Sequence, residues 1–217
     1  AAVGATVNVC VFDRSVLVDI GEHAQIRSLK RQQGNNVIIQ AMGNDSTLLI
    51  SFAGGASASS AAISGAIPVV VAISEIRAEI GRYAVIEAGD TIVVVAHMES
   101  GMYNIAGGVS VSGGSAGVGA TLSTLVVSSD IQAVVNDFVN MIAHAVLNTG
   151  IAVPGGVVLP NRSSRRRGVL ISATARTNLV MASASGGIST GSAAVGGVIN
   201  TLVMSNKVKA IVKNSVA

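Results

Sequence analysis

Apolar and variable residues alternate in a short segment that occurs four times along the chain. The four copies are Val16–Ile20, Ile76–Ile80, Ile131–Val135 and Val208–Val212. In each copy the first, third and fifth residues are apolar, while the second and fourth range from Asp and Lys to Leu and Val. Successive side chains of a strand point to opposite faces, so this pattern predicts a β-strand with one buried face.

Other elements recur in step with this strand. A stretch of small residues precedes it in every copy: Ala2–Ala5, Ala62–Gly65, Gly117–Ala120 and Ala194–Gly197. Three copies also contain an earlier strand: Val37–Ala41, Ile92–Ala96 and Val169–Ala173. Between the two strands of these copies lies a double glycine: Gly54-Gly55, Gly107-Gly108 and Gly186-Gly187. The elements are offset from copy to copy by 60, 55 and 77 residues, which indicates an internal repeat.

A repeat of about 55 residues with several short strands cannot bury its apolar face alone, but it can do so by stacking on its neighbours. The pattern therefore predicts an all-β solenoid that forms one segment over residues 1–217. Strands of about 5 residues, separated by Gly and Ser turns, predict two or three coils of about 20 residues in each repeat. The expected repeats are listed by residue number: 1–36 (partial), 37–91, 92–168 and 169–217.

The third repeat is longer than the others and predicts an insertion at about 136–168. Apolar residues fall at helical spacing from Phe138 to Val146, and Asn136 or Asp137 could cap the first turn. We expect a short amphipathic helix here, followed by a turn-rich excursion that contains Pro154 and Pro160.

Composition restricts what can fill the core. Half of the residues are hydrophobic, but only 2% are aromatic and Trp is absent, so the core is built from small and β-branched side chains. The charged content of 12% is too low for a disordered chain. A single cysteine excludes an intrachain disulfide. The chain starts within the pattern and shows no signal peptide, so we expect a piece of a longer protein.

Three uncharged stretches raise an alternative fold. Residues 52–73, 105–129 and 177–205 each reach the length of about 20 residues that a membrane-spanning helix needs. An integral membrane protein with Gly/Ser-rich helices is therefore one alternative. These stretches nearly lack the Leu and Phe that favour helices in lipid, and they have no aromatic or basic flanks. We therefore expect no membrane insertion.

Little in the sequence indicates catalysis or a cofactor. His23, His97 and His144 have no metal-ligand spacing, which predicts surface residues and no metal site. The glycine pairs lack the residues of a phosphate loop or a calcium roll, so we predict turn or tight-packing glycines and no cofactor. Glu75 and Asp130 share one repeat column, which leaves a polysaccharide-binding or polysaccharide-cleaving enzyme as an alternative. Otherwise we expect no catalytic residue.

One cluster of positive charge stands out. Arg162, Arg165, Arg166 and Arg167 follow the expected insertion. They could contact an anionic partner, such as a sulfated glycan, a lipid headgroup or an acidic coil, or they could simply lie in a solvated loop. Because no aromatic stacking residues accompany them, nucleic acid is not expected as a partner.

Several motifs resemble those of known proteins. The double glycine, Ala194–Gly197, Asn200-Thr201 and Lys207–Ile211 resemble repeats of leukotoxin-family filamentous adhesins, which are similar to filamentous hemagglutinins and autotransporter passengers. The resemblance implies a right-handed parallel β-helix with the short helical insertion described above. It further implies a structural and adhesive segment of a large secreted bacterial surface protein. Its partners would be neighbouring coils of the same parent chain and an unidentified glycan or protein on host or bacterial cells.

Overall fold

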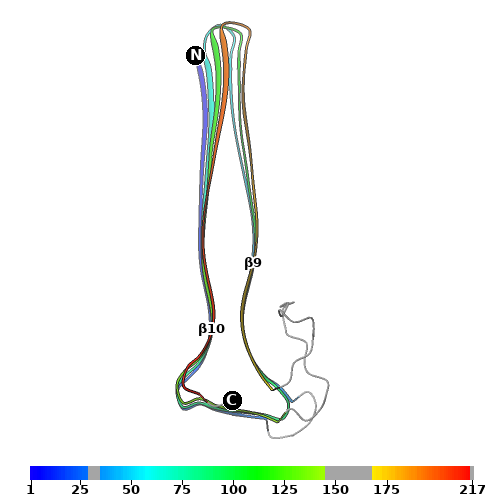
Figure 1. Ribbon diagram of the computed structural model, residues 1–217. Helices are drawn as coiled ribbons and strands as arrows, with labels where there is room; N and C mark the ends of the chain where they lie inside the picture. The colour runs from blue at the N-terminus through cyan, green and yellow to red at the C-terminus, as the bar shows by residue number, and fades with distance from the viewer. Residues whose placement is uncertain (29–34, 145–167, 216–217) are drawn as a thin grey trace.

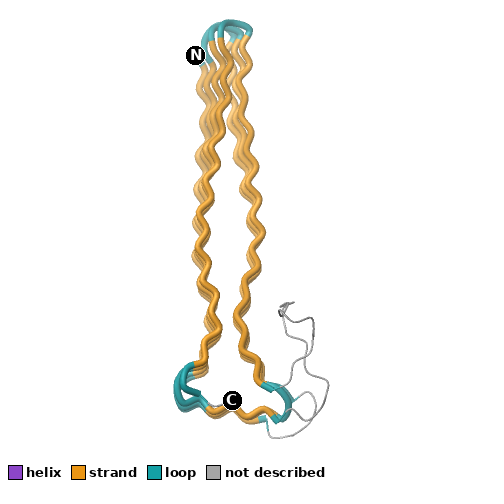
Figure 2. Tube along the Cα trace, viewed as in Figure 1, coloured by secondary structure: helices purple, strands orange, loops and turns teal. Residues whose placement is uncertain are grey.

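The computed structural model describes residues 1–28, 35–144 and 168–215. The described chain forms a tall, narrow blade with two long sheets side by side and a short sheet across one end (Figures 1 and 2). Its strands are β1 (Ala2–Ile20), β2 (Gln25–Arg27), β3 (Val37–Ser57), β4 (Ala62–Ile80), β5 (Val85–Ala88), β6 (Ile92–Ser112), β7 (Ala116–Val135), β8 (Asn140–Ala143), β9 (Val169–Ser189) and β10 (Ala193–Val212).

Each coil visits the three sheets in the same order. The front sheet has the order β1-β4-β7-β10, the base sheet β2-β5-β8 and the back sheet β3-β6-β9. A coil rises along the back sheet, turns at the tip, descends along the front sheet and crosses the base (Figure 1). All neighbouring strands are parallel, so the chain is an all-β solenoid, as predicted.

The repeat alignment coincides with the pairing register of the front sheet. Val16 pairs with Ile76, Ile76 with Ile131 and Ile131 with Val208. These side chains point inward and belong to the apolar core near the base. The columns recognised in the sequence are therefore rows of stacked side chains.

The predicted coil size was wrong. Each repeat forms one coil, and strands of 19 to 21 residues replace most of the expected short strands. The double glycines lie inside β3, β6 and β9 and not at turns. They are tight-packing glycines, because a Cβ added at Gly55 would lie 2.7 Å from the carbonyl oxygen of Ile63 in the opposite sheet.

The predicted helix is also contradicted over its described part. Asn136–Val139 form the turn at the base, and Asn140–Ala143 form β8, which pairs with β5. Phe138 adopts a left-handed backbone with φ of 61°, which no α-helix contains. Asn140 is 55 residues from its partner Val85, whereas Val169 is 77 from Ile92. The extra residues of this repeat therefore lie between Ala143 and Val169, and the proposed helix beyond His144 falls outside the described residues.

The three uncharged stretches are not helices. Each one runs up the back sheet, around the tip and down the front sheet as strand, turn and strand. Within residues 1–28, 35–144 and 168–215, no helix is long and apolar enough to cross a membrane.

The interior changes in character along the blade. Near the base it is filled by Ile, Val, Ala and Met, with Ile76, Ile86, Ile92 and Ile131 fully buried. Towards the tip the inward side chains become small and polar, and Ser64, Thr121 and Ser123 are buried there. Glycines let the two backbones approach, since a Cβ on Gly119 would lie 2.5 Å from the Gly186 carbonyl oxygen. The tip half therefore has a thin interior with few large apolar side chains.

Candidate functional site

The predicted arginine cluster cannot be placed. Arg162, Arg165, Arg166 and Arg167 lie outside the described residues. Their contact with an anionic partner stays a prediction, and the candidate site must be built from the three described surfaces that follow.

The outer face of the front sheet is charged near the base. Glu75 and Asp130 are register partners on β4 and β7, and Lys207 pairs with Asp130 on β10. Gln132 Nε2 donates a hydrogen bond of 2.7 Å to Asp130 Oδ1. Two neighbouring carboxylates beside an ammonium group could bind cationic or hydroxyl-rich ligands, and the surface carries different charges on each coil.

The three histidines lie apart and have different environments. His97 is only 7% exposed, and its Nδ1 lies 2.7 Å from Thr174 Oγ1 on the neighbouring strand, so the prediction of a surface residue was wrong for it. His144 Nε2 lies 3.0 Å from Glu87 Oε1. His23 lies in an exposed turn. Among the described residues, no group of three or more His, Cys, Asp or Glu could hold a metal ion.

An aromatic column lines the corner between the front and base sheets. His23, Tyr83 and Phe138 occupy the same turn position in successive coils, each with a left-handed φ of 58–61°. Their rings stack in parallel, with centroids 4.9 Å apart for His23 and Tyr83 and 5.2 Å for Tyr83 and Phe138. Tyr83 is therefore not isolated, as the sequence had suggested. Because the rings cover one another's faces, this column stabilises the corner rather than offering Tyr83 to a ligand.

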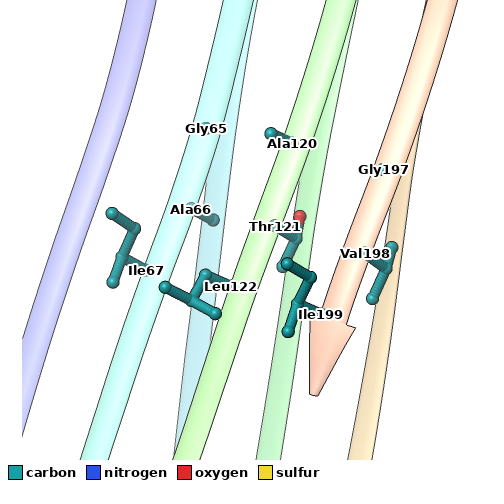
Figure 3. Close-up of a pocket in the computed structure, with 9 residues that line it drawn as sticks. All are labelled: Gly65, Ala66, Ile67, Ala120, Thr121, Leu122, Gly197, Val198 and Ile199. Atoms are coloured by element: carbon teal, nitrogen blue, oxygen red, sulfur yellow. The ribbon is translucent and has the colours of Figure 1, made fainter. Parts of the chain in front are cut away.

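The tip half of the front sheet presents an apolar groove to the outside. Gly65, Ala120 and Gly197 form its floor, and a wall of larger residues stands beside them: Ile67, Leu122 and Ile199. The groove has a volume of about 370 Å³. Figure 3 shows Leu122 and Thr121 pointing to opposite sides of the sheet. Thr121 Oγ1 donates a hydrogen bond of 3.4 Å to the Ala184 carbonyl of the back sheet, so Leu122 faces outward.

The sequence contained a signal for this groove that we did not use. Its floor is the last residue of each small-residue stretch, which is Ala or Gly in all four copies. We treated the outward positions as free to vary, so we did not expect an apolar outer surface.

Comparison with known proteins gives no further guidance. No protein-family model, curated protein or solved structure matches this chain. The functional proposals below rest on the structure and the sequence.

Proposed function

We propose that the chain is a structural and adhesive segment of a large secreted bacterial surface protein. The observation that supports this proposal is the in-register stack of long parallel strands, which makes a stiff plate with two broad outer faces. Backbone hydrogen bonds in every coil carry the structure, so outward residues can differ from coil to coil without loss of the fold. Such a plate suits display of a contact surface outside the cell.

The charged base half of the front sheet is the proposed contact surface. Its outward residues Glu75, Arg77, Asp130, Lys207 and Lys209 change in sign from strand to strand. The Arg77–Glu79 ion pair of 2.8 Å is partly exposed, so it contributes little to stability and its charges can rearrange towards a partner. The partner class is a glycan or protein on host or bacterial cells.

A binding assay tests this proposal. The purified chain, immobilised and probed with a glycan panel and with whole host and bacterial cells, should retain at least one of these targets in a saturable manner. Binding should weaken when Lys207 and Lys209 are replaced by Glu. The control replaces Leu48 and Val180, exposed on the back sheet, by Ser. Equal loss in both variants, or no saturable binding, would reject the adhesive role.

A polysaccharide-active enzyme is a second proposal, and it is favoured by one observation. Glu75 and Asp130 are side by side on adjacent strands, and a pair of carboxylates is what glycoside hydrolysis requires. If this proposal holds, new reducing ends appear when the chain is incubated with anionic polysaccharides. Glu75→Ala and Asp130→Ala should each abolish them, and Glu99→Ala on the back sheet should not. Absence of turnover with the wild-type chain rejects the enzyme.

A further inference from the structure

The tip half of the blade reverses the usual distribution of polarity. On the outer face of the front sheet, aliphatic side chains are exposed by 38% at Ile67 to 74% at Val3. Other members of this aliphatic face are Val7, Val9, Val11, Ile63, Leu122, Val195, Ile199 and Val203. The inward side chains at the same height, such as Ser64 and Ser123, are polar and buried. A contiguous aliphatic face of this kind marks an interaction surface.

The aliphatic face has relief as well as apolar character. Its floor row consists of Ala5, Gly65, Ala120 and Gly197, which stack in register across four strands. The wall row, two residues further along each strand, consists of Val7, Ile67, Leu122 and Ile199. The face therefore carries a ridge beside a groove, and the spacing between them is the same in every coil. A surface with this relief is complementary to itself.

Lipid hydrocarbon is a poor occupant for this face. It would surround the outer strands as well, and the outer edges of β1, β3, β9 and β10 carry backbone N–H and C=O groups with no neighbouring strand among the described residues. Each such group costs several kcal/mol in hydrocarbon. A flat protein surface covers the face alone and leaves the strand edges in water.

End-to-end joining does not explain the face either. The front sheet has four described strands, whereas the back and base sheets have three. A β1 strand that paired with β10 would leave a gap one strand wide in the other two sheets. Such a joint would also leave the outer face of the front sheet uncovered.

We propose that the aliphatic face binds the same face of a second copy of this chain. The second copy is turned about an axis parallel to the stacking direction, so its strands run antiparallel to those of the first. The Ile67 row of each copy then lies in the Gly65 row of the other, which makes the contact isologous. The blades overlap at their tips, and the charged rows at Glu75 and Asp130 remain outside the contact.

The size of the face fits a weak, specific dimer. Four strands about 4.8 Å apart and nine residues of about 3.3 Å each give roughly 19 Å by 30 Å, or about 570 Å² per copy. The total of about 1,100 Å² is near the lower limit of specific interfaces. We therefore expect reversible dimerisation in the micromolar range.

Sedimentation velocity over a concentration series of the 217-residue chain tests the proposal. Gly197→Val fills the groove, and no atom lies within 4 Å of the added Cβ, so the fold should tolerate it. The matched control is Gly54→Val on the back sheet, where the nearest atom is the Val109 carbonyl oxygen at 3.9 Å. Circular dichroism verifies that both variants are folded. We expect Gly197→Val to weaken the dimer by about tenfold or more and Gly54→Val to leave it unchanged.

A second pair of variants tests the wall of the groove. Leu122→Lys should abolish the dimer by burying a charge, and Val180→Lys, at a similarly exposed position on the back sheet, should not. Three results would overturn the proposal: a monomer at all concentrations, equal effects of the paired variants, or flotation with phosphatidylcholine–phosphatidylglycerol vesicles that Gly197→Val does not alter. These readouts involve no glycan or cell, so they are independent of the adhesive role.

Discussion

Gly119 provides the most direct test of how the two long sheets fit together. It lies in β7, and a Cβ at this position would point into the back sheet, 2.5 Å from the Gly186 carbonyl oxygen and 3.0 Å from that of Gly108. Backbone oxygens cannot rotate out of the way, so Gly119→Ala has to push the sheets apart. Overpacking of this kind typically costs about 1–3 kcal/mol.

A matched glycine separates the steric effect from the effect of alanine on the unfolded chain. Gly54 points outward, and the nearest atom to its added Cβ is 3.9 Å away. Gly54→Ala should raise the free energy of unfolding by about 0.5–1 kcal/mol, because alanine loses less backbone entropy in a strand. The same gain applies at Gly119, so the difference between the two variants measures the steric cost.

Thermal and urea unfolding followed by far-UV circular dichroism provide the measurement. The two variants should differ by about 1–3 kcal/mol, or by about 2–12 °C in Tm for a chain of this length. If Gly119→Ala is as stable as Gly54→Ala, the sheets are not in close contact at this height. The explanation of the double glycines given above would then be wrong.

Two further predictions concern the base corner and the arginine cluster. Asn136 bonds to Glu79 Oε1 at 2.5 Å, to the Ile80 carbonyl at 3.0 Å and to Lys213 Nζ at 2.8 Å, so Asn136→Ala should lower the free energy of unfolding by about 1–3 kcal/mol. An unchanged urea midpoint would contradict this role. Replacing the four arginines, Arg162, Arg165, Arg166 and Arg167, by Ala should weaken retention on immobilised heparin, and the difference from wild type should shrink as salt rises. Equal elution of the variant and the wild type would show that the cluster does not bind anions.

Periodicity and repeat offsets were enough to predict the solenoid and its front-sheet register. The alternating copies at Val16, Ile76, Ile131 and Val208 stack as predicted, because a one-residue slip would move every buried side chain to the outside. This constraint lies in the sequence itself, so alignment of the copies could recover it.

The size of the coil could not be predicted in the same way. Glycine pairs are typical of turns, but they are also what two closely packed backbones require, and Gly107-Gly108 serves the second purpose. Only the opposite sheet distinguishes the two cases. The helix expected at Phe138–Val146 failed for a related reason. Over the described residues its apolar spacing arises from a turn followed by the short strand β8, whose Met141 packs into the core.

The candidate site was the least predictable part. Repeat alignment placed Glu75 and Asp130 in one column, and they are neighbours in the structure. The aliphatic face was missed because outward positions were taken to be polar or variable. At the tip, Val9 and Val11 are exposed while polar residues fill the interior, which no rule of burial from hydrophobicity anticipates.

The unequal spacing of the coils bears on how such a protein acquires new segments. Partners in the back sheet are 55 residues apart between β3 and β6, and 77 apart between β6 and β9. The entropy of closing a flexible loop rises only with the logarithm of its length, so the longer connection costs about 0.3 kcal/mol more than the shorter one. The corner between the base and back sheets is thus a place where sequence can be gained at almost no thermodynamic expense. An epitope or a reporter domain grafted between Ala143 and Val169 should leave the neighbouring strand pairs in register.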